Sequence, residues 1–400
     1  MENKQNSGVT KSQFACISWY MFIMKFRGLN LLRIGGIPVI IDYSWFIIFF
    51  LMVYTMAENY FPSTQIQLTT VEYWAMGMVA SLLLFASVLI HELAHSFVAV
   101  KQEVRVNSIR LFIFGGIAQV SSEPKSGRSE FLIALAGPVV SMALGFAFGL
   151  IYALFTAAGI FYPAARVAFY LASANIILAV FNMIPGFPLD GGRILRAILW
   201  DRWDDMARAT KVVSQIGNGF AHFLIILGVL QFLFAQRLIS GLWFIFIGWF
   251  LKQSAVGSYQ AVTLKRALAG VRIQQIMTRN VVTVDWLVSV EELVRDYVYK
   301  HQFTHFPVFN REEYIGMVSL DEVKSVPKEL WGFKQVRDIM APAELVPSLS
   351  PAEDATEALA RMVSGNLGLL PVIDNGHFVG IVSRRDIMNL FKIKSDLGAA

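Results

Sequence analysis

Two histidines and a glutamate form the most chemically suggestive group in this sequence. In His91-Glu92-Leu93-Ala94-His95 the imidazoles lie one helical turn apart, so both can reach one tetrahedral metal ion. Glu92 lies beside them, where a carboxylate can act as a base. The motif interrupts an apolar run over 73–100, where an ionisable side chain costs about 2.5–3.5 kcal/mol. This setting favours a metal site over side chains that only hydrogen-bond neighbouring helices, an alternative that the motif alone leaves open.

A zinc ion that does chemistry usually has three protein ligands and one open position. Asp190 is the best candidate for the third ligand, because it closes the apolar stretch 167–189 and follows Pro185 and Pro188. Two prolines must break or bend a helix, and irregular backbone at membrane depth is tolerated only where protein or a water-filled cavity satisfies it. Spacing alone also allows Asp190 to cap the helix that follows.

The remaining histidines have weaker claims to a metal. His222 could be a fourth ligand, but an interhelical hydrogen bond is the favoured interpretation, since nothing nearby adds ligand character. His301, His305 and His377 are scattered in the last third of the chain, where structural roles are expected.

The composition predicts that these groups lie in a membrane domain. Apolar residues make up 56% of the 400 residues and charged residues only 16%, against an ordinary share of about 25%. Residues 1–256 hold 18 Lys and Arg and 12 Asp and Glu, whereas residues 257–400 hold 16 and 17. The first part is typical of a membrane-embedded protein and the second of a soluble one. A disordered chain, a disulfide scaffold and an all-soluble enzyme are excluded.

Six apolar stretches approach the roughly 20 residues that are needed to cross a bilayer. They cover 34–57, 73–100, 131–160, 167–189, 212–236 and, as the shortest, 238–251. Lys and Arg are frequent in every second connecting segment, which predicts a cytoplasmic side for those segments and for both termini. Residues 1–33 would form a cytoplasmic N-terminal segment, and no nucleic-acid partner is expected, because the basic excess belongs to the membrane part.

The chain repeats itself after about residue 257. Ile276-Met277 recurs as Ile339-Met340, and Pro307-Val308 as Pro371-Val372. Each copy contains a helix-period stretch followed by a strand, a turn and a strand, so a repeated β-α-β-β-α unit is predicted. Two such copies can bury their sheets against each other.

Three motifs together resemble the site-2 protease family of intramembrane zinc metalloproteases. They are the HELAH sequence at 91–95, the segment Phe112-Ile-Phe-Gly-Gly-Ile-Ala118, and Asn182-x-x-Pro-x-x-Pro-Leu-Asp190-Gly-Gly, and they occur in the family's order. The likeness covers roughly residues 34–256, the predicted transmembrane metalloprotease domain. The tail resembles a pair of CBS domains, at 270–328 and 334–394, which some prokaryotic members carry on the cytoplasmic side.

The resemblance implies a role for each matched residue. His91, His95 and Asp190 would bind one zinc ion per chain, and Glu92 would activate its water. Asn182 would help to hold the scissile carbonyl or the oxyanion. Zinc lowers the pKa of bound water towards 7, and an amide donor is a usual complement to the negative oxygen that develops.

The resemblance also implies that Gly115 and Gly116 belong to an extended strand that grips the substrate. A transmembrane helix hides its carbonyl groups in its own hydrogen bonds, so it must unwind before attack. Strand addition could replace the hydrogen bonds that are given up. Without the family, this glycine pair would be interpreted as a turn between two spans.

The CBS resemblance implies an adenine nucleotide ligand. In such pairs a Gly-h-h-Ser/Thr-x-x-Asp stretch lies beside a cleft that often binds adenosine nucleotides, with the Asp reaching the ribose. The second copy matches through Ser383 and Asp386, whereas the first has Glu322 at the ribose position and Asp321 one place earlier. Regulation by a bound nucleotide and a purely structural or dimerising module remain alternatives, so a homodimer is one option.

The sequence therefore predicts a multi-pass α-helical membrane domain of about six transmembrane helices, followed by a soluble α+β tandem CBS domain pair. The expected protein is an intramembrane zinc metalloendopeptidase of the cytoplasmic membrane. It would cleave a transmembrane segment of a single-span protein, such as an anti-sigma factor or a membrane-held regulator. The alternative is a CBS-regulated transporter or channel that uses the His/Asp cluster as an ion path. Such a transporter has no need of Glu92 beside the paired histidines.

Overall fold

A computed structural model of the chain describes residues 28–64, 68–113, 115–120, 123–159, 162–234, 238–365 and 367–397. Most of the predicted N-terminal segment 1–33 therefore lies outside the described residues. The chain divides into two compact units, Met1–Gln260 and Ala261–Ala400, and each is described by itself.

Five helices of the first unit are long and apolar enough to cross a membrane, which confirms a multi-pass helical domain. They are α2 (Tyr43–Thr55) with its short continuations Met56–Tyr60 and Pro62–Thr64, α3 (Thr70–Lys101), α4 (Gly127–Ala158), α5 (Tyr162–Asn182) and α7 (Met206–Phe234). The first unit also contains α6 (Asp190–Trp203) and α8, which runs over Leu238–Leu268 and passes into the second unit. The predicted sixth span, 238–251, is helical as the first half of α8 but is not among the five described helices that meet this measure.

The predicted first span is wrong at its beginning. Residues from 34 to 42 are not helical, because strand β2 (Ile37–Asp42) follows β1 (Gly28–Ile34) in an antiparallel pair. The β-branched residues of β2 and its proline favour extended backbone. Asp42 then starts α2 as its N-cap, with Oδ1 accepting from the Ser44 N–H at 2.9 Å.

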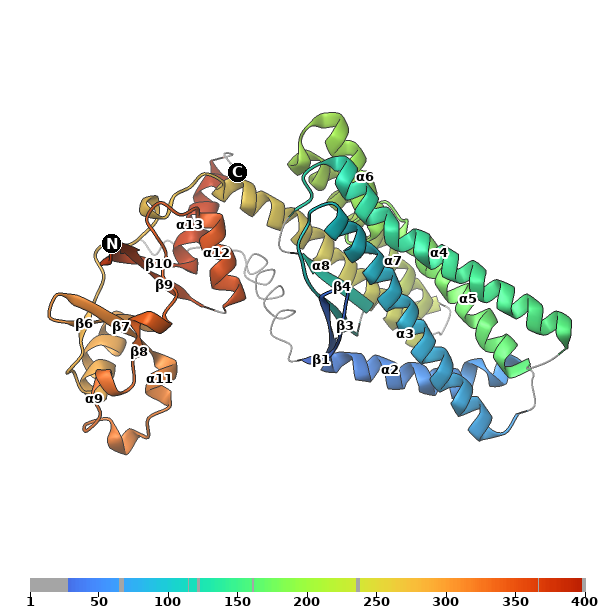
Figure 1. Cartoon of the computed structure of the whole chain (residues 1–400), viewed down its shortest axis with the longest axis horizontal. Coiled ribbons are helices and arrows are strands. Elements are labelled where there is room, and N and C mark those ends of the chain that lie inside the picture. The colour runs from blue at the N-terminus through green and yellow to red at the C-terminus, as the bar shows by residue number, and fades with distance from the viewer. Residues whose placement is uncertain are drawn as a thin grey trace. The chain divides into compact units, whose positions relative to one another are not determined.

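A four-stranded sheet lies along α3, as the ribbon in Figure 1 shows. Its order is β1-β2-β3-β4, with β3 at Val106–Phe112 and β4 at Gly115–Val120. β2 and β3 pair in parallel, with Val39 opposite Ile109, and β3 and β4 form an antiparallel hairpin. Both residues of that parallel pair are fully buried, so the centre of the sheet belongs to the core.

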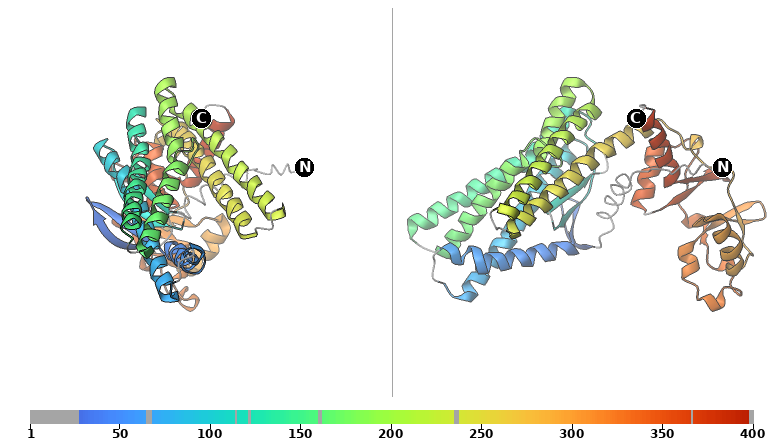
Figure 2. Two further views of the ribbon diagram at one scale, coloured as in Figure 1. Left: turned by 90° about the vertical axis from the view of Figure 1, so that its right-hand side faces the viewer. Right: turned by 180° about the vertical axis from the view of Figure 1, so that it is seen from behind.

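Helices α3, α4, α5 and α6 surround the polar centre of the first unit. α4 and α5 lie side by side along much of their length, as the views in Figures 1 and 2 agree. The predicted stretch 167–189 is not one continuous helix, because α5 ends at Asn182. Pro185 and Pro188 follow within a turn-rich segment that leads to Asp190, the first residue of α6.

The second unit contains two β-α-β-β-α repeats, which confirms the predicted CBS pair. The first repeat comprises β5 (Val284–Asp285), the helical segments Val290–Glu292 (α9), Leu293–Val298 and Tyr299–His301 (α10), β6 (His305–Asn310), β7 (Glu313–Ser319) and α11 (Leu320–Lys324). The second comprises α12 (Ala355–Ser364), β9 (Leu369–Asp374), β10 (His377–Ser383) and α13 (Arg384–Asp396), with β8 (Ala341–Pro342) before it.

The segments that precede the two repeats are exchanged. β8 pairs with β7 of the first repeat, and Thr278 bridges Ile381 in β10 of the second. Ile276 accordingly packs on the core of the second repeat, and Ile339 packs on that of the first. The two cores therefore interleave across the predicted domain boundaries, because β8 joins the sheet of the first repeat and Thr278 bridges β10 of the second.

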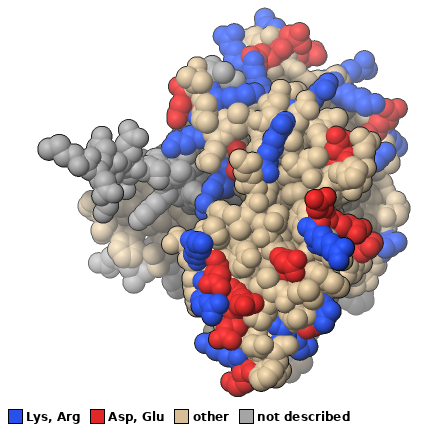
Figure 3. Space-filling model, turned by 90° about the vertical axis from the view of Figure 1, so that its left-hand side faces the viewer, with Lys and Arg blue, Asp and Glu red and all other residues tan. Residues whose placement is uncertain are grey.

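Charged side chains of both signs are interspersed on the face of the molecule shown in Figure 3. The second unit is rich in both, since residues 257–400 hold 16 basic and 17 acidic side chains. Such a mixed surface is typical of a domain that faces water.

Candidate metal centre

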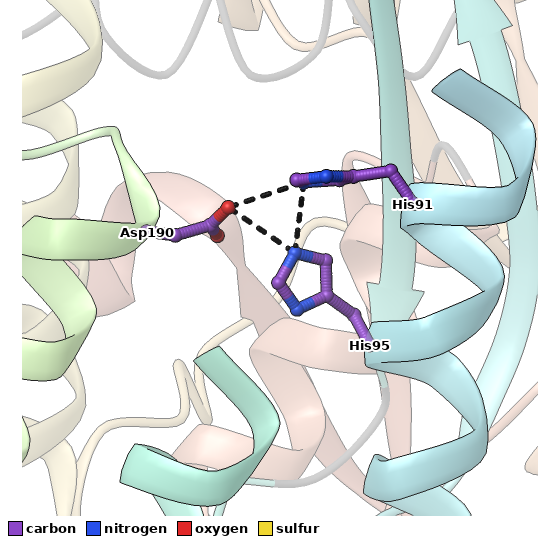
Figure 4. Close-up of side chains that lie close together, drawn as sticks. All are labelled: His91, His95 and Asp190. Carbon is purple, nitrogen blue, oxygen red and sulfur yellow. Dashed lines mark hydrogen bonds and ion pairs between the residues drawn. The ribbon is translucent and has the colours of Figure 1, made fainter. Parts of the chain in front are cut away.

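Three side chains from two helices point at one spot inside the first unit (Figure 4). His91 Nε2 lies 3.2 Å from Asp190 Oδ2, and His95 Nε2 lies 3.2 Å from the same oxygen. The two Nε2 atoms are 3.1 Å apart. Both imidazoles are buried, with 4% and 5% of their surface exposed. The structure thus brings together three of the residues that the sequence singled out.

The triangle of donor atoms fits a zinc ion. Ligand atoms at about 2.0–2.2 Å from tetrahedral zinc lie roughly 3.3–3.6 Å from one another, which is close to the observed separations. Two neutral imidazole nitrogens and one carboxylate oxygen are a donor set that catalytic zinc sites use. A divalent cation also explains why two nitrogen lone pairs and a carboxylate face each other in a buried place.

The other nitrogen of each ring fixes which atom faces the centre. His95 Nδ1 donates to the Ile133 carbonyl at 2.7 Å, so its proton is on Nδ1 and the lone pair is on Nε2. His91 Nδ1 lies 2.8 Å from Ser141 Oγ, a hydroxyl that is fully buried. Both partners belong to α4. Second hydrogen bonds of this kind orient metal-binding histidines in proteins.

Gly137 of α4 lies against the two imidazole nitrogens that face the centre. A Cβ atom at this position would lie 2.2 Å from His95 Nε2 and 2.5 Å from His91 Nε2. Only a glycine therefore lets α4 approach the imidazoles this closely. Pro138 follows within the helix and has no N–H to donate to the carbonyl four residues earlier.

Asp190 is not a helix cap. The N-cap of α6 is Leu189, and the Asp190 carboxylate is directed to the histidines instead. The next two glycines let α6 begin against the preceding loop, because a Cβ at Gly191 would lie 2.2 Å from the Met183 carbonyl oxygen. The segment between α5 and α6, and the glycines at the start of α6, thus place the Asp190 carboxylate beside the histidines of α3.

Glu92 lies against strand β4. A Cβ at Gly116 would come within 2.4 Å of Glu92 Cγ and 3.1 Å of Oε1. The glycine pair is part of a strand rather than a turn, and Gly115 has a φ of +123° that disfavours other residues. β4 is the last strand in the sheet order, so Glu92 and an edge strand lie together.

Asn182 is the last residue of α5 and is partly exposed. Its neighbour Met183 touches Gly191 at the start of α6, which places the end of α5 beside the helix that carries Asp190. The structure brings the Asn182 amide into no hydrogen bond among the described residues.

The other histidines lie apart from the metal cluster of the described residues. His222 Nδ1 donates to the Asn218 carbonyl at 2.7 Å, and Lys252 Nζ donates to His222 Nε2 at 3.3 Å. The second bond joins α7 to α8, as the favoured interpretation of His222 expects.

The candidate nucleotide residues form helix caps. Ser383 N–H and hydroxyl both donate to Asp386 Oδ2, at 2.8 and 2.7 Å, in a capping box at the start of α13. Ser319 and Glu322 form the same box at α11. The glutamate of the first copy therefore occupies the structural position of the aspartate in the second.

The residues of α4 are the part of the site that the sequence analysis missed. Glu130, Gly137 and Ser141 are fully buried or nearly so in an otherwise apolar helix. Their spacing of seven and then four residues places them on one face. A polar or glycine residue repeated at helical spacing within an apolar stretch was the signal that could have identified them.

Comparisons with known proteins agree with this geometry. The model of peptidase family M50 matches residues 79–162 and 157–226, and the CBS domain model matches residues 273–329 and 336–393. Rip3 from Mycobacterium tuberculosis is 36% identical over 365 residues, which cover 90% of this chain and 92% of that protein. MJ0392 from Methanocaldococcus jannaschii is 31% identical over 372 residues, 92% of this chain and 98% of that protein.

Both relatives carry the name of zinc metalloproteases. Among solved structures, the site-2 protease from Methanocaldococcus jannaschii is 28% identical and covers 58% of this chain and 95% of that one, with a TM-score of 0.41. The transporter alternative is not favoured. The chain belongs to peptidase family M50, the site-2 proteases, and is a membrane zinc metalloprotease with a CBS domain pair.

Proposed function

We propose that the protein cleaves a peptide bond within the transmembrane segment of a single-span membrane protein. His91, His95 and Asp190 would hold the zinc ion, and Glu92 would be the general base. The observation that carries this proposal is the convergence of three ligand atoms within 3.2 Å of one another beside a carboxylate that touches an edge strand.

The bound zinc would polarise the scissile carbonyl and make its water acidic. Glu92 would take the proton from the attacking water as the new C–O bond forms, and would deliver it to the amide nitrogen as the C–N bond breaks. Asn182 would donate its amide N–H to the oxygen that becomes negative. The Nδ1 hydrogen bond from His95 to Ile133 keeps the imidazole in the required orientation throughout.

Strand β4 would hold the unwound substrate. It is the last strand of its sheet, so its outer edge can pair with an extended peptide. Gly116 lies against Glu92, which would place a peptide on this edge near the base. A substrate helix that gives up its own hydrogen bonds would regain some of them here.

The test compares Glu92→Gln with the wild type, purified in detergent with a candidate single-span substrate. Bound zinc should stay near one ion per chain, while cleavage is lost and a chelator abolishes the wild-type activity. Cleavage that survives the substitution would remove Glu92 as the base.

Anti-sigma factors and membrane-held regulators are the proposed substrate class. Accumulation of one of these proteins in its intact form in cells with Glu92→Gln would support this proposal.

We further propose that the second CBS repeat binds an adenine nucleotide. The capping bonds use Asp386 Oδ2, so Oδ1 remains to accept from a ribose hydroxyl. ATP or AMP should raise the melting temperature of the full chain, and Asp386→Asn should reduce this shift. Absence of any shift and of any heat of binding with these nucleotides would count against regulation.

The proposed location is the cytoplasmic membrane, with both termini in the cytoplasm. The alternation of Lys and Arg between connecting segments supports it. A cysteine introduced at exposed Ser63, between the first and second predicted stretches, should react with an impermeant reagent added to whole cells. A cysteine at Asn375 in the CBS pair should react only after lysis.

A homodimer remains a prediction that light scattering on the purified protein would test.

A further inference from the structure

Glu130 is a buried acid that the proposed mechanism does not use. It lies in the first turn of α4 and is fully buried. Arg196 of α6 donates through Nε to Oε1 at 2.9 Å and to Oε2 at 3.1 Å, and its Nη2 also donates to Oε1. Arg193 is a second cation, with Nε 3.9 Å from Oε1. Both carboxylate oxygens are thus held by a planar guanidinium fork, which fixes direction as well as distance.

The same arginine also holds the loop that leads to Asp190. The Arg196 guanidinium lies over the Phe187 ring, 5.0 Å from its centroid. Phe187 is buried and belongs to the segment between α5 and α6. Next to the ion pair, a Cβ at Gly127 would lie 2.6 Å from the Ala197 carbonyl oxygen, so the backbones of α4 and α6 touch. Glu130 and Arg196 therefore fasten α6 and its leading loop to α4.

One face of α4 reaches both of the candidate histidine ligands. Ser141 and the Ile133 carbonyl contact the Nδ1 atoms of His91 and His95, and Gly137 abuts both Nε2 atoms. Glu130 lies two turns before Gly137 on the same face, roughly 10 Å away. On α6, Arg196 lies about 9 Å beyond Asp190. α4 thus contacts the two histidines of α3 and, two turns earlier, is bound through the ion pair to the helix that carries Asp190.

We propose that Glu130, acting through Arg196, is a positioning residue that sets the register of α6 so that Asp190 Oδ2 meets the two imidazoles. This inference rests on the proposed metal ligands. It makes the affinity for the metal depend on an ion pair that touches none of the ligand atoms. Outer partners that orient ligands typically change metal affinity by about 10- to 100-fold when they are removed.

The test titrates Co²⁺ into chelator-stripped full-length protein and follows its visible absorption, with a competing chelator to obtain the affinity. Two variants are suited to it. Arg196→Lys keeps the charge and loses the fork. The double variant Glu130→Gln with Arg196→Met removes both charges, so that no buried charge is left unpaired. Both should bind Co²⁺ about 10- to 100-fold more weakly, with a changed absorption band.

Arg208→Lys is the matched control, because exposed Arg208 lies over Trp203 at 4.8 Å near the far end of α6. It should leave the affinity and the band unchanged. If the variants lose thermal stability without metal but bind Co²⁺ with wild-type affinity and spectrum, Glu130 is merely structural and the inference is overturned. If wild-type protein and His91→Ala bind Co²⁺ alike, the proposed metal ligands fail instead, so the two failures are distinguishable.

Discussion

The hydrogen-bond partner of Nδ1 decides whether the other nitrogen of each imidazole, Nε2, can bind a metal. His95 Nδ1 has a backbone carbonyl as its acceptor, and a carbonyl can only accept, so the nitrogen that faces the centre must carry a lone pair. His91 has the buried Ser141 hydroxyl at the same place. The metal site is therefore defined as much by α4 as by the motif on α3.

Gly137→Ala should abolish tight metal binding. The added methyl would lie 2.2 Å from His95 Nε2, so the rings or the helix must move. We expect at least a tenfold loss of zinc affinity and a corresponding loss of cleavage, measured by metal content after dialysis and by substrate cleavage. Gly149→Ala on the same helix is the control, since its Cβ would meet only the Ala172 methyl at 3.9 Å. Full zinc content in Gly137→Ala would contradict the close approach.

Gly116→Ala should separate catalysis from metal binding. Its methyl would displace the Glu92 side chain, whose Cγ lies 2.4 Å from the Cβ position and which supplies the three atoms nearest to it. A misplacement of about 1 Å can cost roughly 10²-fold in rate, so kcat should fall by about this factor while zinc content stays unchanged. Unaltered kcat would show that the base does not depend on β4.

At the scale of elements, the membrane helices approach one another through glycines. α7 and α8 touch where a Cβ at Gly228 would lie 2.6 Å from the Gly241 carbonyl oxygen. Small residues at such crossings let the backbones of two membrane helices pack closely. This packing stabilises the pair, because the hydrophobic effect does not drive apolar helices together within lipid. α4 uses the same device twice, at Gly127 against α6 and at Gly145 against α5.

Gly228→Leu should destabilise the first unit. The side chain cannot fit between α7 and α8, and such overpacking costs about 1–3 kcal/mol. The melting temperature of the protein in detergent should fall. Gly219→Leu is the matched substitution on α7, with nothing within 4 Å of its Cβ position, and it should melt like the wild type. Equal melting of the two variants would mean that the α7–α8 contact contributes nothing.

At the scale of the whole molecule, the chain joins a membrane unit to a mixed-charge unit with different physical chemistry. Among the described residues, the ionisable side chains that are buried all belong to the first unit: Asp42, His91, His95 and Glu130. The second unit is also held together by exchanged strands, so neither repeat is complete without the segment that precedes the other. Perturbing one repeat should therefore destabilise both.

The stability of the second unit should depend on pH through His305. Burial lowers the pKa of His305 below its usual 6.5, and the charges of Glu322 and Asp321 only partly oppose this. The folded unit therefore holds His305 neutral, while the unfolded chain takes up a proton below about pH 6.5. Stability should be full above this pH and fall as the pH decreases through the folded pKa.

The melting temperature of the second unit, followed in the full chain at pH 7.5 and pH 5.5, measures this effect. His305→Gln should make the difference between the two values smaller. His377→Gln, at the exposed first residue of β10, should leave the difference as in the wild type. An equal difference in all three proteins would assign the pH dependence to other groups.

The sequence by itself determined the chemistry and the architecture. The spacing of His91 and His95, the apolar stretches and the repeated segments each follow from local periodicity, which a chain carries whatever its tertiary contacts. Asp190 could be proposed as the third ligand because the two prolines before it break a helix at membrane depth. The beginning of the first stretch was misassigned, since strand and helix segments of similar apolarity look alike until their partners are known.

Only the tertiary structure decided what surrounds these groups. That Gly137 abuts the imidazoles, that Ile133 accepts from His95 and that Glu130 holds Arg196 are contacts between helices far apart in the chain. The exchange of strands between the CBS repeats is likewise a long-range pairing. Such contacts depend on the rotation and register of each helix. A hydrophobic pattern shows which face of a helix is buried, but it does not show which atoms of two helices meet.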